Sequence, residues 1–171
     1  MNQTSFHSPD SYLVYLIADE RLYGKVHGRP VDLKAASGGA RGSENSRRVE
    51  TDAGSFDYRK EWVSDARGER GGPLPPGRYV VHCTARHPHV GISNWLEPIT
   101  ARYKNRNGFF LHHRGPKGSD GCIVPYFDNE LDALQARIDA VGHAIPLWVA
   151  LSATPPSTAE ILRKMLDPYS A

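Results

Sequence analysis

The sequence is short of cysteine, of excess charge of either sign and of long apolar runs. Its 171 residues include two cysteines, Cys83 and Cys122, too few for a disulfide scaffold or a four-thiolate zinc site. The 21 Lys and Arg nearly balance 19 Asp and Glu, for a net charge of +2, whereas nucleic-acid-binding domains usually carry a marked basic excess. No segment is apolar enough to span a bilayer, and the first residues lack the basic and apolar regions of a secretory signal. We therefore expect no nucleic-acid partner, no transmembrane segment and no Sec-type export signal.

What the sequence does contain is a series of short apolar segments separated by turns. Hydrophobic residues make up 39% of the chain and charged residues 23%, as in ordinary globular domains. Runs rich in branched and aromatic residues predict strands at 12–17, 21–26, 31–36, 78–84, 108–112, 122–124 and 145–151. These segments predict a mainly β domain with peripheral helices.

One segment near the C-terminal end has helical periodicity. Apolar residues recur at three- and four-residue steps, at Leu131, Leu134, Ile138 and Val141. Asp128 is interpreted as the N-cap and Gly142 as the stop.

The chain divides into three parts by composition. We expect a flexible N-terminus over residues 1–11, one catalytic domain over 12–151, and a C-terminal extension over 152–171 with a short helix. Two long connections are expected inside the domain, 37–72 and 85–107. The second holds Trp95, interpreted either as part of a lid over the site or as the anchor of an ordinary loop.

The residues that carry chemistry lie between Phe109 and Pro125. An apolar strand ends at His112, and nine residues separate it from Cys122, which follows Gly121. A thiol is only slightly ionised at neutral pH, and a neighbouring imidazole that accepts its proton makes the thiolate available. Backbone N–H groups at Gly121 and Cys122 would stabilise the oxyanion of a tetrahedral intermediate. Taken singly, a buried cysteine and a histidine at a strand end are more often structural.

Taken together, these residues resemble the active-site signature of the L,D-transpeptidase (YkuD-like) family. The matching pieces are Phe110-Leu111-His112 and Ser119-Asp120-Gly121-Cys122-Ile123. Upstream, the segments 36–38 and 72–79 resemble the small Ser/Thr-Gly turn and the Pro- and Gly-containing turn of the family. The resemblance covers residues 12–150 and implies an antiparallel β-sandwich or barrel, with no cofactor and no metal.

The departures from that signature point to a subgroup. Asp120 stands where the family usually has a second histidine, His113 where it has glycine, and the intervening loop is short. The pattern Gly-Ser-Asp-Gly-Cys-Ile-Val-Pro resembles the L,D-transpeptidase-like toxins delivered by type VI secretion. This implies a protein made in the cytoplasm without a signal peptide, secreted, and active in the periplasm of a target bacterium. Its partners would be peptidoglycan stem peptides, a secretion component and an immunity protein.

The resemblance also implies roles for individual residues. Cys122 would be the nucleophile and His112 its base, cleaving tetrapeptide stems through a thioester as an L,D-carboxypeptidase, an L,D-transpeptidase or both. Neighbouring strand residues point to opposite faces, so only one of His112 and His113 should face Cys122. The backbone carbonyl of His113 would orient the base, and the backbone N–H of Gly121 would help to stabilise the oxyanion. Substrate contacts are expected from Arg114, Ser119, Asp120 and Trp95.

Three other interpretations remain open at this point. His82, Cys83, His87 and His89 suggest zinc, but their spacing matches no common ligand pattern and adjacent strand residues diverge. A papain-like peptidoglycan amidase normally has its cysteine before its histidine. A wall-binding module that has lost activity is compatible with the departures at Asp120 and His113, and the retained Cys122 and His112 weigh against it.

Overall fold

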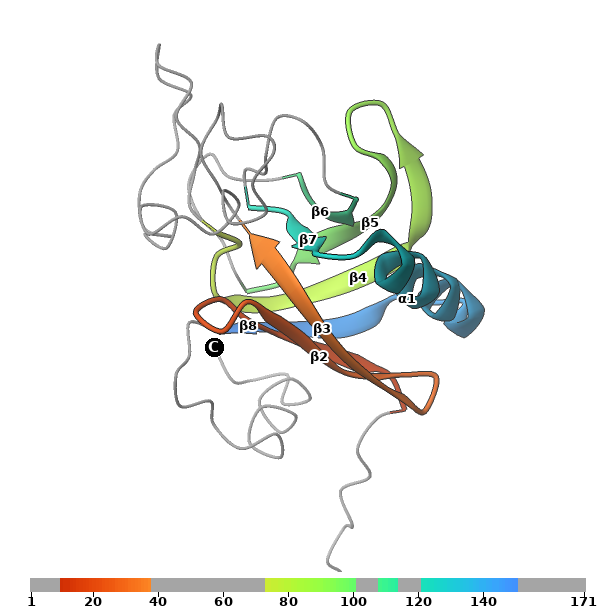
Figure 1. Cartoon of the computed structure of the whole chain (residues 1–171), viewed down its shortest axis with the longest axis horizontal. Coiled ribbons are helices and arrows are strands. Elements are labelled where there is room, and N and C mark those ends of the chain that lie inside the picture. The colour runs from red at the N-terminus through yellow and green to blue at the C-terminus, as the bar shows by residue number, and fades with distance from the viewer. Residues whose placement is uncertain (1–9, 38–72, 101–107, 114–120, 151–171) are drawn as a thin grey trace, which may run out of the picture.

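The computed structural model describes residues 10–37, 73–100, 108–113 and 121–150 (Figure 1). Eight strands and one helix follow each other along the chain in these segments. They are β1 (Tyr12–Leu16), β2 (Arg21–Val26), β3 (Arg29–Ser37), β4 (Gly77–His87), β5 (Gly91–Pro98), β6 (Phe109–His112), β7 (Ile123–Pro125), α1 (Asp128–Val141) and β8 (Ile145–Ala150).

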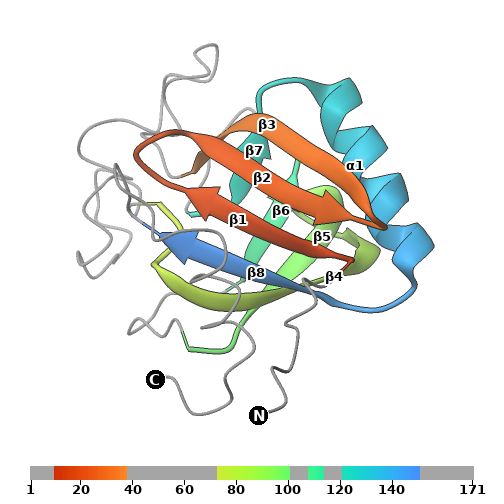
Figure 2. The same cartoon turned by 90° about the horizontal axis from the view of Figure 1, so that it is seen from below.

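The strands close into a barrel in the order β1-β2-β3-β7-β6-β5-β4-β8. Most neighbours are antiparallel, but β1 pairs with β8 in parallel and β6 pairs with β7 in parallel. Figure 2 shows the β1–β2–β3 meander on one side, with β8 and β4 continuing the sheet beyond β1. The predicted fold class, mainly β with a sandwich or barrel architecture, is confirmed.

Glycine is required at position 24, where β2 pairs closely with β1. A Cβ on this residue would lie 2.2 Å from the carbonyl oxygen of Tyr12, and its φ is +146°. Only glycine combines that backbone angle with so close an approach. The tight β1–β2 contact therefore depends on the absence of a side chain at one position.

The inward faces of the strands form a single core with the helix. Leu13, Tyr15, Val81 and Leu147 are buried in it, and α1 adds Leu131, Leu134 and Ile138. Each such side chain contributes about 1.5–3 kcal/mol when fully removed from water. The helix lies at one end of the barrel, beside β2, β4 and β7 (Figure 2).

The ends of α1 agree only in part with the prediction. Gly142 ends the helix in the left-handed conformation with φ 76°, as expected. The N-cap is Phe127 rather than Asp128, and no side chain makes a capping hydrogen bond there. Asp128 instead lies in the first turn with Glu130, where a negative charge interacts favourably with the helix dipole. Within the described residues, the structure contains no helix of sufficient length and hydropathy to cross a bilayer.

The prediction of a long loop over residues 85–107 is wrong for most of the part that the structure describes, because these residues form strands. Strand β4 continues to His87, and residues 91–98 form β5, which pairs with both β4 and β6. The expected loop over 37–72 and the C-terminal helix lie outside the described residues, apart from Ser37 at the end of β3. The domain boundaries remain a prediction.

Candidate active site

The site is built on the parallel pair β6 and β7. Phe109 and Leu111 of β6 belong to the core, so alternation directs Phe110 and His112 to the outer face of the barrel. Leu111 is in register with Ile123, which places Cys122, immediately before β7, beside Phe110. Cys122 and His112 are ten positions apart in sequence, and strand pairing and alternation place both on the outer face, at the adjacent strands β6 and β7 (Figure 1).

The thiol of Cys122 is buried and held by backbone groups. Its exposed fraction is 8%. The Phe110 N–H donates a hydrogen bond to Sγ over 3.3 Å, and Sγ lies 4.0 Å from the Gly108 carbonyl oxygen. The N–H donor at sulfur stabilises the thiolate, whereas burial and the S–H group directed at the Gly108 carbonyl stabilise the neutral thiol. Strand β6 thus carries His112 and also supplies the Phe110 N–H group that contacts Cys122.

His112 is fixed by the residue that follows it. Its Nδ1 lies 2.5 Å from the His113 carbonyl oxygen. A carbonyl only accepts hydrogen bonds, so Nδ1 carries the proton and the Nε2 lone pair of the neutral ring is left to accept one. This is the orienting contact that the resemblance implies.

Burial lowers the pKa of His112 to about 4. The residue is 4% exposed. The hydrogen bond to the His113 carbonyl raises the pKa, and electrostatic repulsion from His113 and His87 lowers it further. The ring is therefore neutral at pH 7, the state in which it can accept a proton from a thiol.

His113 points away from Cys122. Its Nε2 lies 2.9 Å from Asp132 Oδ1 on α1, so the two adjacent histidines face opposite sides of β6. The side chain of His113 thereby anchors the end of the strand to the helix, while its carbonyl group orients His112.

The turn that precedes Cys122 is held by Ser37. The Ser37 hydroxyl donates to the Gly121 carbonyl over 3.1 Å and accepts from the Leu74 N–H over 2.9 Å. Ser37 is fully buried, and Gly121 has φ 105°, a value that favours glycine. The two upstream segments quoted for the family resemblance therefore meet at the residue before the cysteine. The sequence identified both segments but could not show that Ser37 joins them.

Trp95 lies on β5, not in a lid loop. It is in register with Phe110, and 43% of its surface is exposed. The other residues predicted to contact substrate, Arg114, Ser119 and Asp120, lie outside the described residues.

Three residues near the site were not assigned a catalytic or substrate-binding role from the sequence. His82 stacks on Trp95 with a centroid distance of 4.9 Å and an interplanar angle of 17°, and its Nε2 lies 2.8 Å from Glu97 Oε2. The ring of His87 lies 4.6 Å from that of Phe110. Their positions depend on β5, which the sequence analysis did not predict.

The zinc interpretation gains no support from these contacts. In the described segments, no three His, Cys, Asp or Glu side chains gather as metal ligands would. Cys83 is a free thiol and half-buried. No pairing with Cys122 is present, since both thiols are free.

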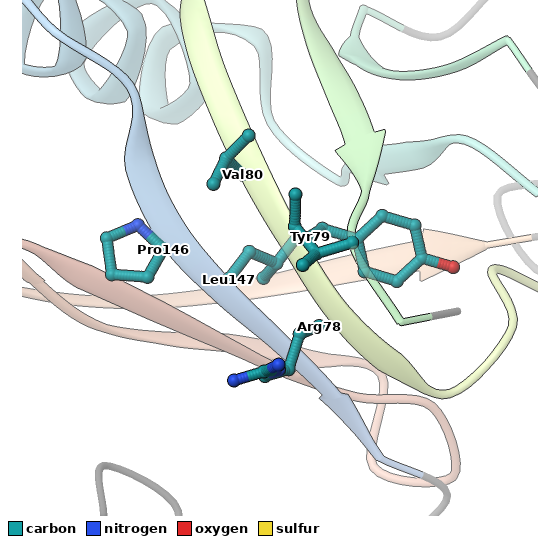
Figure 3. Close-up of a pocket in the computed structure, with 6 residues that line it drawn as sticks. Arg78, Tyr79, Val80, Pro146 and Leu147 are labelled. Carbon is teal, nitrogen blue, oxygen red and sulfur yellow. The ribbon is translucent and has the colours of Figure 1, made fainter. Parts of the chain in front are cut away.

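A separate hollow of about 260 Å³ lies on β4 and β8. Arg78, Val80 and Pro146 surround it, and Tyr79 extends from β4 in another direction (Figure 3). The strands β5 and β6 lie between β4 and β7 in the barrel, and the hollow contains none of the residues around Cys122.

Comparison with known proteins gives similarity of fold. No family profile and no curated protein sequence matches the chain. Among solved structures, the L,D-transpeptidase (residues 123–326) from Xylanimonas cellulosilytica DSM 15894 is similar over 88% of this chain, with 13% identity and a TM-score of 0.48. The L,D-transpeptidase from Mycobacterium smegmatis is similar over 82%, with 14% identity and a TM-score of 0.42. The chain spans 65% and 58% of those two chains.

Proposed function

We propose that the protein is a cysteine-dependent enzyme that acts on the tetrapeptide stems of peptidoglycan. The observation that carries the proposal is the pairing of a buried, backbone-held thiol at Cys122 with a neutral, oriented imidazole at His112 on adjacent parallel strands. The sequence signature around these two residues gives the substrate class.

The reaction follows from the roles of the two side chains. His112 takes the thiol proton, and the Cys122 sulfur attacks the carbonyl carbon of the third stem residue. The C–N bond to the terminal D-amino acid then breaks, and the proton on His112 passes to the leaving amine. The resulting thioester transfers its acyl group to water, which gives L,D-carboxypeptidase activity, or to an amine, which gives L,D-transpeptidase activity. Backbone N–H groups at Gly121 and Cys122 would stabilise the oxyanion in both steps.

The test is mass spectrometry of purified tetrapeptide muropeptides incubated with the protein, with and without a free D-amino acid. We expect loss of the terminal residue, or its exchange, and neither product with Cys122→Ala. A carbapenem or iodoacetamide should label Cys122 faster than Cys83, a control thiol in the same chain. Labelling at equal slow rates and no product would instead favour an inactive wall-binding module, and release of the whole stem would favour an amidase.

We further propose that the enzyme is an antibacterial effector delivered by type VI secretion. The motif that includes Asp120 and His113 supports this proposal, as does the location of mature stem peptides outside the inner membrane. Expression with a fused Sec signal should lyse or swell cells, whereas cytoplasmic expression and the Cys122→Ala fusion should be harmless. Killing from the cytoplasm through Cys122 would contradict a wall target, and with it the need for a secretion component and an immunity protein.

A further inference from the structure

The outer face of the barrel carries a row of aromatic side chains that begins at the nucleophile. Phe110 lies beside Cys122, Trp95 is in register with Phe110, and His82 stacks on Trp95. These four residues come from four neighbouring strands or their ends. Since strands lie about 4.8 Å apart, the backbone of Trp95 is about 10 Å from that of Cys122.

Trp95 is exposed and yet held in a fixed orientation. The stacked ring of His82 covers it at an interplanar angle of 17°, and His82 is held in turn by Glu97 over 2.8 Å. An exposed indole that only covered the sheet would not need two side chains to orient it. A pre-oriented aromatic face loses less entropy when a ligand stacks on it.

The chemistry around this indole suits a sugar ring. The axial C–H groups of a pyranose form an apolar face of the size of an aromatic ring, and its hydroxyl and amide groups lie around the edge. The indole supplies an apolar plate, and Glu97, which contacts the stacked His82 ring, carries carboxylate oxygens that accept hydrogen bonds. One carboxylate oxygen of Glu97, Oε2, contacts His82 Nε2, and a carboxylate can accept further hydrogen bonds from sugar hydroxyl groups.

The spacing identifies which sugar this would be. In the proposed thioester, three residues separate the sulfur from the sugar that bears the stem. An extended chain spans at most about 3.3–3.6 Å per residue, so three residues reach about 10 Å. This reach is comparable with the separation of about 10 Å between the backbones of Cys122 and Trp95. We infer that Trp95, oriented by His82 and Glu97, forms a saccharide subsite for the sugar to which the stem peptide is attached, an inference that rests on the proposed function.

The test compares a disaccharide-tetrapeptide with the same tetrapeptide freed of its sugars. Wild-type protein should prefer the sugar-bearing substrate by about tenfold in kcat/KM, as expected for one aromatic stacking contact. Trp95→Ala should abolish most of this preference, mainly through KM, and Trp95→Phe should retain part of it. Ile92→Ala is the matched control, because Ile92 lies on the same strand with 43% exposure but outside the row, and it should keep the wild-type preference.

A binding measurement separates this inference from the proposed reaction. Calorimetry with the disaccharide-tetrapeptide and Cys122→Ala protein should give a Kd about tenfold lower than that of the Cys122→Ala, Trp95→Ala double variant. Equal Kd values, or a loss of activity in Trp95→Ala that is the same for both substrates, would overturn the subsite. Trp95-dependent binding without turnover by the wild-type protein would instead overturn the proposed reaction and leave the subsite standing.

Discussion

Acid should destabilise the protein through His112. Burial lowers the pKa of this imidazole from 6.5 to about 4. Above pH 6.5, the ring is neutral in the folded and unfolded states, and the protein has its full stability. As the pH falls towards 4, the unfolded chain takes up a proton that the folded protein does not. The difference corresponds to about 3 kcal/mol of unfolding free energy, lost across this window, which is a large fraction of the 5–15 kcal/mol typical of a domain.

The matched perturbation is His112→Asn. An asparagine amide keeps a donor near the position of Nδ1, so the hydrogen bond to the His113 carbonyl can be retained, but it does not titrate. Urea unfolding at pH 7.5, 6.5, 5.5 and 4.5 should show that wild-type protein loses about 2.5 kcal/mol more than His112→Asn between the highest and the lowest pH. Carboxylates titrate in the same window, but they do so in both proteins, and their contribution cancels in the comparison.

His143 offers the control for this experiment. Its Nδ1 contacts the carbonyl of the next residue, Ala144, at 3.0 Å, in the same local arrangement, but the side chain is exposed. His143→Asn should follow the wild-type pH dependence. Parallel curves for wild-type and His112→Asn protein would refute the argument that burial keeps this imidazole neutral, and with it the reason that it can act as a base.

Four other predictions follow from contacts in the structure. Cys122→Ala should abolish product formation but shift the melting temperature by only a few degrees, because a small side chain is lost; turnover in this variant would exclude the thioester. His113→Ala should reduce kcat much less than His112→Ala, since its side chain faces α1; the reverse order in a steady-state assay would reassign the base. Ser37→Ala should cost about 2–4 kcal/mol in urea unfolding, since it removes two buried hydrogen bonds, and an unchanged midpoint would show that Gly121 is held otherwise. Gly24→Ala should cost more than about 3 kcal/mol, because its Cβ would lie 2.2 Å from a backbone oxygen. Gly28→Ala, where φ is +71° and no atom lies within 4 Å, should cost only about 1–2 kcal/mol, and equal effects would contradict the role given to steric contact.

The strands that could be predicted from the sequence are those made of continuous or alternating apolar residues. Tyr12 to Leu16 is buried on both faces, and a continuous run of aromatic and branched residues is typical of such a strand. The prediction failed at β5, where Ser93 and Asn94 interrupt the apolar pattern. Asn94 is fully buried because its amide donates to the His82 carbonyl and accepts from Gln135 of α1, 41 residues away. A polar residue that is satisfied only by tertiary contacts gives no local signal of burial.

The site was predictable where it depends on one strand and not where it depends on the order of strands. Alternation along the strand predicts that His112 and His113 face opposite sides, and the contact of His113 with Asp132 of α1 agrees with this. The contact between Ser37 and Gly121 requires that β3 pair with β7, which are 84 residues apart at this point. The aromatic row requires β4, β5 and β6 to be adjacent. Neither adjacency can be read from a single sequence without knowing the topology.

The organisation of β6 explains why the chemistry and the core are coupled. Within four residues, Phe109 and Leu111 anchor the strand in the core, while alternation places Phe110 and His112 on the outer face. The backbone between them supplies the N–H that contacts Cys122. The next residue, His113, holds the imidazole with its carbonyl and is itself held by Asp132 of α1. A shift of α1 would therefore rotate the His113 peptide and misorient His112, even though no helix side chain is needed at the thiol. The contact between His113 and Asp132 is thus one route by which α1 influences the orientation of His112.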